Sequence, residues 1–597
     1  MRRAALRLVL VLTLTAAGMA QTTDLSPRRW SDAPRRQAEQ AEMTAPSPAA
    51  PREVVGTSGL VLSTLSPIAA LAGVETMKRG GSAADAAVAV SLTQITTALG
   101  TNISFAGITE VVYYEARTRR TYALNAGWDA WSGERDRASI PLSATSPFAP
   151  PETSGGSVPA GRRTLVPGFM AGMEALHKRF GVLRFADLLG PAIGYADEGV
   201  TVTPWLHAYF DRFRPALAAT AAGQRFMRQA GGTIPRTGER FVQKELAATL
   251  RAVAAHGARE MYSGQWAREF AAAVNAAGGH ASMDDLRRYQ VRWSEPVTTP
   301  FHGFGIASAS DSIGAQAIRE SLALVDHAGL AARFPYSRNA ASLVDLSRIL
   351  AWASAASSQP AMLQGLAAGG VDISPAGRLT PAYAKAVAPI LGTLFLLPPA
   401  ASPPPPSEHS ASAVVVDATG NVAVLIHTSN TFAWGSTGLV VGGIPIPDAA
   451  GLTAARFPAV KPGDRIPHDM APLIAFKGGE PVLPLAAIGA SLVPESVRVI
   501  VALLAEGRDV RGVLSSPPLL LSTAQSPPGG GSPVLALQVP AGAYDADLIA
   551  QLRAQRINVK ECSPAEVAAL RGTAAVARVT GTRAESAEIP GIFNFVR

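Results

Sequence analysis

One segment past the middle of this 597-residue chain constrains the fold more than any other, because it has the pattern of a β-hairpin that begins at a serine. Residues 410 to 416 and 422 to 428 are two apolar runs rich in β-branched side chains. Between them lies Asp417-Ala418-Thr419-Gly420-Asn421, which is a strong turn signal. The two runs are therefore expected to pair as antiparallel strands.

The register of this hairpin places two hydroxyl side chains opposite each other. If Val416 faces Val422, then Ser410 faces Thr428. Cross-strand partners have Cβ atoms about 4.5 to 5.5 Å apart, so the two hydroxyl groups come within reach of a hydrogen bond. A slip of one residue would send them to opposite faces of the sheet. The pairing is a geometric prediction that a structure tests directly.

A proline-rich run precedes the hairpin and gives its first residue a further property. Pro398-Pro399 and Pro403-Pro404-Pro405-Pro406 favour an extended, solvated chain that cannot join a sheet, and such a segment is easily cut. A break between His409 and Ser410 would leave a hydroxyl nucleophile and an α-amino group on one residue. An α-amine titrates at about pH 7.7 to 8.0, where a general base is useful. The alternative is a plain linker followed by an ordinary hairpin.

Three further blocks, in order along the chain, carry a resemblance to a known family. They are Gly80-Gly81-Ser82-Ala83-Ala84-Asp85-Ala86-Ala87-Val88-Ala89, then Val166-Pro167-Gly168 with Leu188-Leu189-Gly190-Pro191-Ala192-Ile193, and then Val242-Gln243 through Tyr262-Ser263-Gly264 to Tyr289. With the Ser410 hairpin, where the family has a threonine nucleophile, they resemble the γ-glutamyltransferase (γ-glutamyl transpeptidase) family of N-terminal-nucleophile enzymes. No single block is specific, but their order and spacing together are.

The resemblance implies an α+β fold, a four-layer αββα sandwich made as one precursor that cleaves itself before Ser410. Residues 56–409 would form the large subunit, ending in the proline-rich linker, and residues 410–597 the small subunit of the same composite fold. The implied activity is acyl transfer or hydrolysis on γ-glutamyl or related amides, small molecules or peptides, through an acyl-enzyme on Ser410. Thr428 aligns with a hydroxyl that supports the nucleophile, and Asn430 with an asparagine that contacts the substrate. No cofactor is expected.

Several positions depart from the family pattern. The nucleophile is serine instead of threonine, and Ser412 is a rival candidate because an alignment shift of two residues preserves the strand face. The family's arginine that binds the substrate carboxylate falls on Gly127, and glycine cannot replace a guanidinium group. The family's acidic pair falls near Pro447-Asp448-Ala449-Ala450, so the group that binds the substrate amine is absent or displaced.

Two further pairs align with substrate-binding positions. The family's Ser-Ser is His468-Asp469, and its oxyanion-binding Gly-Gly is Gly489-Ala490. Backbone N–H groups survive the change to Ala490 only if this residue has a negative φ. An imidazole base at His468 is a minor alternative to a structural or turn pair, because adjacent residues on a strand point to opposite faces. A catalytically degenerate family member that acts as a non-enzymatic binding protein is the alternative function.

The N-terminal residues have the pattern of an exported protein. Arg2, Arg3 and Arg7 precede an apolar run, and Gly18-Met19-Ala20 offers a cleavage site, so residues 1–20 are predicted to be a signal peptide. The expected location is periplasmic or secreted. Residues 21–55, rich in Pro, Ala, Gln and charged residues, are predicted to be a disordered leader.

Composition excludes other classes of partner. The apolar run is shorter than the roughly 20 residues of a spanning helix, so no stable membrane insertion is expected. The net charge of +8 includes the N-terminal arginines and no basic stripe with aromatics follows, so no nucleic-acid partner is expected. The sequence has 9 histidines, which are scattered, and a single cysteine, Cys562. Because no His, Cys or carboxylate spacing of a metal site is present, no metal site is expected.

Overall fold

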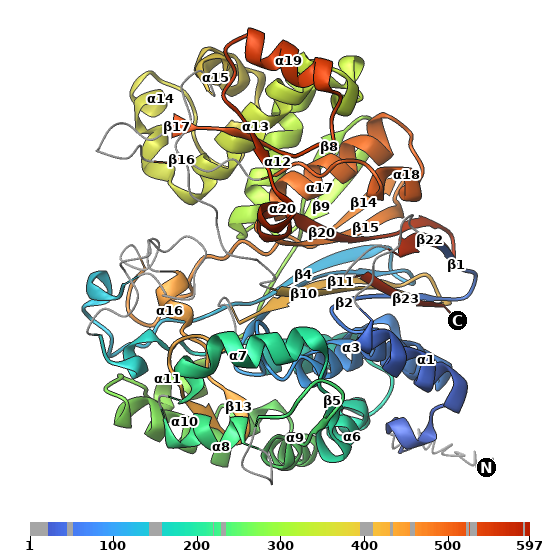
Figure 1. Cartoon of the computed structure of the whole chain (residues 1–597), viewed down its shortest axis with the longest axis vertical. Coiled ribbons are helices and arrows are strands. Elements are labelled where there is room, and N and C mark those ends of the chain that lie inside the picture. The colour runs from blue at the N-terminus through green and yellow to red at the C-terminus, as the bar shows by residue number, and fades with distance from the viewer. Residues whose placement is uncertain are drawn as a thin grey trace, which may run out of the picture.

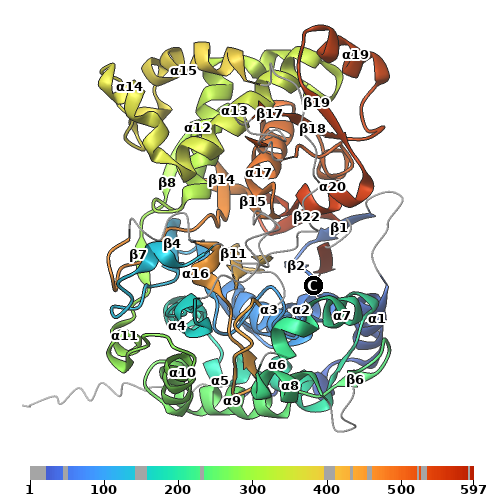
Figure 2. The same ribbon diagram turned by 60° about the vertical axis from the view of Figure 1, so that its left-hand side comes forward.

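The structure is a computed structural model, and it describes most of the chain. The described residues are 22–44, 52–141, 158–218, 220–228, 234–394, 410–429, 434–453, 460–520, 524–525, 534–588 and 592–596. The predicted signal peptide, the proline-rich linker from 395 to 409 and Asn430 lie outside them. Helices and strands form four layers, helix–sheet–sheet–helix, as Figure 1 and Figure 2 show. The predicted α+β sandwich is confirmed.

A seven-stranded sheet carries the predicted hairpin at its centre. In spatial order its strands are β23 (Ile592–Val596), β2 (Leu60–Thr64), β10 (Ser410–Val416), β11 (Val422–Thr428), β3 (Ile108–Glu115), β4 (Arg120–Ala126) and β7 (Arg292–Ser294). β10 and β11 pair antiparallel, and Ser410 lies opposite Thr428 as predicted. Because β2 and β3 flank the hairpin, the sheet interleaves strands from both sides of Ser410. This interleaving gives one composite fold.

A second sheet faces the first and completes the sandwich. Its five strands, in spatial order, are β20 (Gly572–Val576), β15 (Glu480–Gly489), β14 (Leu473–Lys477), β9 (Phe304–Ser308) and β8 (Val297–Phe301). A smaller three-stranded sheet of β1 (Arg52–Gly56), β22 (Arg583–Glu588) and β21 (Arg578–Thr580) lies at one edge. Alternate residues of β10 and β11, such as Val414 and Val424, pack against Ala486 and Ile488 of β15. We call the side that they share the inter-sheet face.

Helices cover the outer face of each sheet (Figure 1). On the seven-stranded sheet lie α2 (Pro67–Lys78), α3 (Ala83–Thr97) and α4 (Phe169–Phe180), with α6 (Gly190–Glu198), α9 (Lys244–His256) and α10 (Gln265–Ala276) beyond them. On the five-stranded sheet lie α12 (Ile313–His327), α13 (Ala340–Ser358) and α17 (Leu492–Ile500). Further helices include α7 (Pro204–Ala218), α15 (Pro381–Thr393) and α19 (Ala546–Ala554), the last followed by β19 (Val559–Cys562).

The hairpin turn is tied to the start of the central helix α3. Asp417 is 5% exposed, and its Oδ1 accepts hydrogen bonds from the backbone N–H groups of Thr419 (2.9 Å) and Asn421 (3.1 Å). Its Oδ2 accepts a hydrogen bond from the N–H of Ala83, 2.9 Å away, at the first turn of α3. A carboxylate at a helix N-terminus is favourable because the N–H groups there carry partial positive charge. One side chain therefore shapes the turn and fixes the hairpin to the helix layer.

The leader predicted to be disordered is ordered where the structure describes it. Residues 22–44 contain a short 3₁₀ turn and α1 (Asp32–Met43), and β1 pairs with β22. Trp30 is 5% exposed, donates from Nε1 to the carbonyl oxygen of Leu25 at 3.0 Å, and packs on Tyr195. The composition of the segment favours disorder, but a few apolar residues find partners on α2 and α6, which no local pattern shows.

No helix in the described part of the chain is long and apolar enough to cross a bilayer.

Replacing Asp417 by alanine is expected to destabilise the protein by about 2–4 kcal/mol, because several buried donors lose a charged acceptor. Thr419→Val is the matched control, since it leaves the bond to Ala83 in place and should cost less than about 1 kcal/mol. Urea unfolding of both variants measures the difference. Equal losses would show that the link to α3 contributes nothing.

Candidate active site

Ser410 and Thr428 lie opposite each other at the open end of the central hairpin. Both side chains belong to the inter-sheet face, because residues 412, 414 and 416 of the same strand point there. Ser410 is partly exposed and Thr428 is 3% exposed. A nucleophile needs access to substrate, while its supporting hydroxyl needs a fixed place. The arrangement meets both conditions.

Ser412, the rival nucleophile, lies in the interior of the same face. It is 0% exposed, and its backbone N–H donates to Oγ1 of Thr64 at 2.7 Å. Its carbonyl oxygen accepts a hydrogen bond from Nε2 of Gln94 at 3.0 Å. Its Oγ lies 3.5 Å from the carbonyl oxygen of Ala486 in the facing sheet. Every polar group of Ser412 is thus used in holding the strands and layers together.

Gln94 on α3 holds the hairpin from the helix side. Its Nε2 donates to Oγ of Ser63 at 3.0 Å as well as to Ser412, and its Oε1 accepts from Nε2 of His427 at 2.7 Å. His427 points away from the inter-sheet face and is 0% exposed. Burial lowers the pKa of His427 from 6.5 to about 3, so its imidazole is neutral. His427 is a structural hydrogen-bond donor on the opposite face from Ser410.

Gly489 and Ala490 lie where β15 ends, in the sheet that faces the hairpin. Gly489 has a φ of +92°, and a Cβ there would lie 2.7 Å from the carbonyl oxygen of Arg571. Glycine is therefore required at this position. Ala490 stays outside the left-handed region, so the condition under which its N–H can serve as a donor is met. Its role remains a prediction.

His468 lies beside Gly127, the position that aligns with the family's arginine. A Cβ at Gly127 would lie 3.0 Å from Cδ2 of His468 and 3.1 Å from Cδ of Arg465. His468 is 2% exposed, and its carbonyl oxygen accepts a hydrogen bond from the N–H of Ile313 at 3.0 Å. Asp469 is partly exposed, and its backbone oxygen lies against Gly314 of α12. The structure thus brings His468 to the lost arginine position, while Asp469 contacts the neighbouring helix.

Arg465 fills the space beside Gly127, yet its guanidinium group is committed within the protein. It donates to Asp129, to the carbonyl oxygen (3.0 Å) and Oδ1 (2.9 Å) of Asn125, and to the carbonyl oxygen of Gln290 (2.8 Å). Only 5% of its side chain is exposed. Arg465 therefore occupies space beside position 127, but its guanidinium group is not available to bind a substrate carboxylate.

The acidic position near residue 448 is also occupied internally. Asp448 is 0% exposed, and its Oδ2 accepts a hydrogen bond from Oγ of Ser436 at 2.8 Å. Ser436 in turn accepts from Nη1 of Arg163 at 2.6 Å. The carboxylate of Asp448 thus takes part in a hydrogen-bond chain with Ser436 and Arg163.

One buried acid on the inter-sheet face escaped the sequence analysis. Glu110 of β3 is 0% exposed, and neither of its carboxyl oxygens has a hydrogen-bond partner among the described residues. Burial raises the pKa of Glu110 well above its usual value, the charge of Asp311 raises it further, and Arg319 lowers it. The available signal was a single acid inside the apolar run Ile108-Thr109-Glu110-Val111-Val112. The sequence does not show which side chains surround it.

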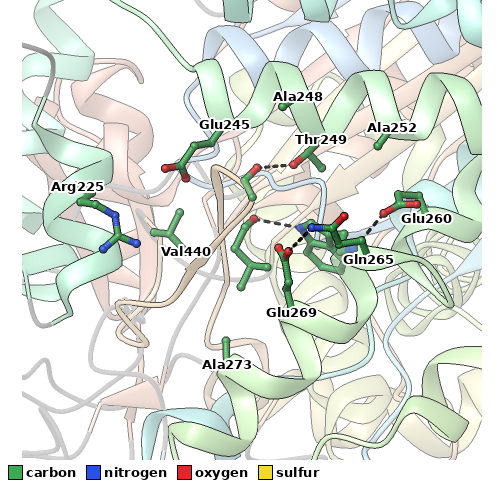
Figure 3. Close-up of a pocket in the computed structure, with 13 residues that line it drawn as sticks. Arg225, Glu245, Ala248, Thr249, Ala252, Glu260, Gln265, Glu269, Ala273 and Val440 are labelled. Atoms are coloured by element: carbon green, nitrogen blue, oxygen red, sulfur yellow. Dashed lines mark hydrogen bonds between the residues drawn. The ribbon is translucent and has the colours of Figure 1, made fainter.

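Other parts of the described structure offer less. No group of three or more His, Cys, Asp or Glu residues there could hold a metal ion. A cavity of about 530 Å³ lies in the outer helix layer between α9, α10 and β12 (Val440–Val441) (Figure 3). In its lining Thr249 donates to Gly442, Trp266 to Val441 and Gln265 to Glu269. The cavity contains none of the predicted site residues.

Comparisons with known proteins find a matching family model and relatives that cover most of the chain. The model of the gamma-glutamyltranspeptidase family matches residues 69–586. The "Glutathione hydrolase-like YwrD proenzyme" of Bacillus subtilis (strain 168) is 27% identical, covering 78% of this chain and 85% of its own. The "Acylase ACY 1 proenzyme" of Pseudomonas sp. (strain V22) is 26% identical, covering 78% and 83%. The "Glutathione hydrolase proenzyme" of Bacillus subtilis (strain 168) is 28% identical over 46% of each chain, so this match spans about half its length.

A solved structure shares the fold over nearly the whole chain. The cephalosporin acylase from Bacillus halodurans superposes with a TM-score of 0.74, covering 93% of this chain and 98% of that one, at 22% identity.

Replacing Gly489 by alanine is expected to destabilise the protein by about 2–4 kcal/mol, because alanine is strained at this φ and its Cβ meets the backbone of Arg571. Ala490→Gly is the matched control and should cost about 1 kcal/mol or less. Thermal unfolding of the two variants gives the comparison, and a neutral Gly489→Ala substitution would contradict the strained turn.

His427 should make stability depend on pH. Because its folded pKa of about 3 lies below the unfolded value of 6.5, the unfolded chain binds the proton first. Stability is expected to fall by about 1.4 kcal/mol for each pH unit as pH drops from about 6.5 towards 3. Urea unfolding from pH 7 to 4.5 measures the slope, and His427→Gln should remove this contribution. If His427→Gln has the same dependence of stability on pH as the wild type, His427 does not have the lowered pKa that burial gives it here.

Proposed function

Because this chain belongs to the gamma-glutamyltranspeptidase family, we propose that it is a self-processing acyltransferase or amidohydrolase with Ser410 as its N-terminal nucleophile. Ser410 facing Thr428 on the inter-sheet face is the observation that carries the proposal. Relatives over most of the chain are named as proenzymes, which supports a precursor cleaved into subunits. Large and small subunits would then be residues 56–409 and 410–597.

The proposed maturation uses the same hydroxyl as the reaction. Oγ of Ser410 attacks the carbonyl carbon of His409, the C–N bond breaks, and the ester formed is hydrolysed by water. The new α-amino group then accepts the proton of the Ser410 hydroxyl as it attacks an amide substrate, and gives it to the departing amine. Water or an amine acceptor takes the acyl group from the Ser410 ester. Thr428 hydrogen-bonds the nucleophile, and the N–H groups of Gly489 and Ala490 stabilise the oxyanion.

The proposed acyl donor is a γ-glutamyl amide or a related amide. By the resemblance, members of the family bind the donor's carboxylate with an arginine. In this chain the corresponding position is Gly127, and the neighbouring Arg465 is already bonded within the protein. Within the proposal, Asn430, His468 and Asp469 line the donor site, and export by a signal peptide places the protein in the periplasm or outside the cell. A non-enzymatic binding protein is the alternative, which the enzymatic relatives do not favour.

Self-cleavage is expected in the purified protein and should be lost in Ser410→Ala. A denaturing gel with intact-mass analysis should give two fragments, and N-terminal sequencing should find Ser410 first in the smaller one. Ser412→Ala is the matched control, because it removes a hydroxyl on the same face and should still cleave. A fragment that begins at Ser412 would move the nucleophile by two residues. An uncut wild-type chain would refute the proposal.

A further inference from the structure

Glu110 projects from the same face of the seven-stranded sheet as Ser410, the proposed nucleophile. It pairs with Ile426 of β11, which pairs with Ser412 of β10, so Glu110 lies two strands from Ser412. Strands are about 4.8 Å apart and residues rise about 3.4 Å, so the Cα atoms of Glu110 and Ser410 lie roughly 12 Å apart. Both side chains project from the inter-sheet face. The two positions are therefore separated by a distance that an acyl chain of a few carbon atoms can span.

The carboxyl group of Glu110 is buried without the partners that such a group requires. It is 0% exposed, and neither oxygen accepts a hydrogen bond from a described residue. A buried carboxyl group without hydrogen bonds is costly, and native structures keep few of them outside functional sites. Its two oxygens are available to a donor from outside the chain.

The charged groups that influence Glu110 are one further carboxylate and one guanidinium group. Nδ1 of His468 lies 3.7 Å from its Oε2, and Asp311 adds a second carboxylate. Arg319 is the nearby cation, but its guanidinium group donates to Ser308, to the carbonyl oxygen of Ala309 and to Gln316. It makes no ion pair with Glu110 among the described contacts.

Asp311 connects this buried group to the protein surface. It is exposed, at the start of the segment that leads into α12, and its Oδ2 accepts a hydrogen bond from Nδ2 of Asn125 at 2.7 Å. Asn125 pairs directly with Glu110 across β3 and β4. Polar groups thus run from solvent to the buried carboxyl group.

We propose that Glu110, with Asp311 on its solvent side, binds an ammonium group at the end of the donor's acyl chain. The inference rests on the proposed function, since it names the acyl donor that Ser410 would attack. An ammonium group offers three N–H donors and a positive charge to the two carboxylates. Arg465, which fills the space beside Gly127, already donates to Asp129, Asn125 and Gln290, so it is not free to bind a carboxylate on the same acyl chain. The preferred donor is an amine-terminated acyl amide without an α-carboxylate.

The binding has a predictable dependence on pH. Glu110 must be ionised to bind an ammonium group, and burial and Asp311 raise its pKa while Arg319 lowers it. KM for such a donor should therefore rise as pH falls through that raised pKa. A donor with an uncharged acyl chain should show no such rise.

Four p-nitroanilides test the proposal on the wild-type protein: 4-aminobutyryl, butyryl, glutaryl and γ-glutamyl. The 4-aminobutyryl donor should have the highest kcat/KM. Glu110→Gln should lower its kcat/KM by about 10-fold to 100-fold, mostly through KM, and leave the butyryl donor within about threefold. Glu115→Gln is the matched control, because Glu115 lies on the same strand, on the opposite face, bonded to Arg117 and Thr118. It should change neither donor.

A second variant keeps the test independent of folding at the buried position. Asp311→Asn changes an exposed side chain and should lower kcat/KM for the 4-aminobutyryl donor selectively. A preference for butyryl or glutaryl, or an equal loss for all donors in both variants, would overturn the inference. If the chain cleaves at Ser410 but turns over none of the four p-nitroanilides, only the inference about Glu110 is overturned. An uncut wild-type chain would overturn both the proposed function and this inference.

Discussion

The backbone ladder between β10 and β11 is the constraint on which the rest of the site depends. It is the centre of a sheet whose other strands come from both sides of Ser410, so its register sets the neighbours of every strand. Two polar groups hold it from the helix side: Asp417 binds the first turn of α3, and Gln94 of α3 binds Ser412 and His427. Because these groups are buried, a shifted register would leave them unsatisfied.

The two faces of the hairpin use polar residues in opposite ways. On the helix side, His427 is neutral and donates from Nε2 to Gln94, which in turn donates to Ser63 and Ser412, while Nδ1 of His427 has no partner among the described residues. On the inter-sheet face, Glu110 is buried beside His468, and its oxygens accept no hydrogen bond from the part of the chain that the structure describes. Hydrogen bonds between the helix and the hairpin add rigidity, while an unsatisfied buried acid lowers stability and is kept where it serves a reaction or a ligand. This contrast supports the proposal that places the reaction on the inter-sheet face.

Local patterns predicted the elements better than they predicted their surroundings. The hairpin of β10 and β11 and its register followed from alternation and turn signals. Order in residues 22–44 did not, because Trp30 and Ala38 are buried by helices distant in sequence. The sequence analysis expects an arginine to be missing at Gly127, but it does not show that Arg465 and His468 pack against this glycine. These two residues come from a segment more than 300 positions later in the chain.

The sequence alone determined the hairpin and the opposition of Ser410 and Thr428, because turn chemistry and period-2 alternation are local properties. It also determined that Gly127 carries no guanidinium group. Only the tertiary structure decided that Arg465 is committed, that Ala490 keeps a compatible backbone and that Glu110 is buried near His468 and Asp311. Burial, satisfied hydrogen bonds and charge balance are set by residues far apart in the chain, and these quantities decide what a site can bind.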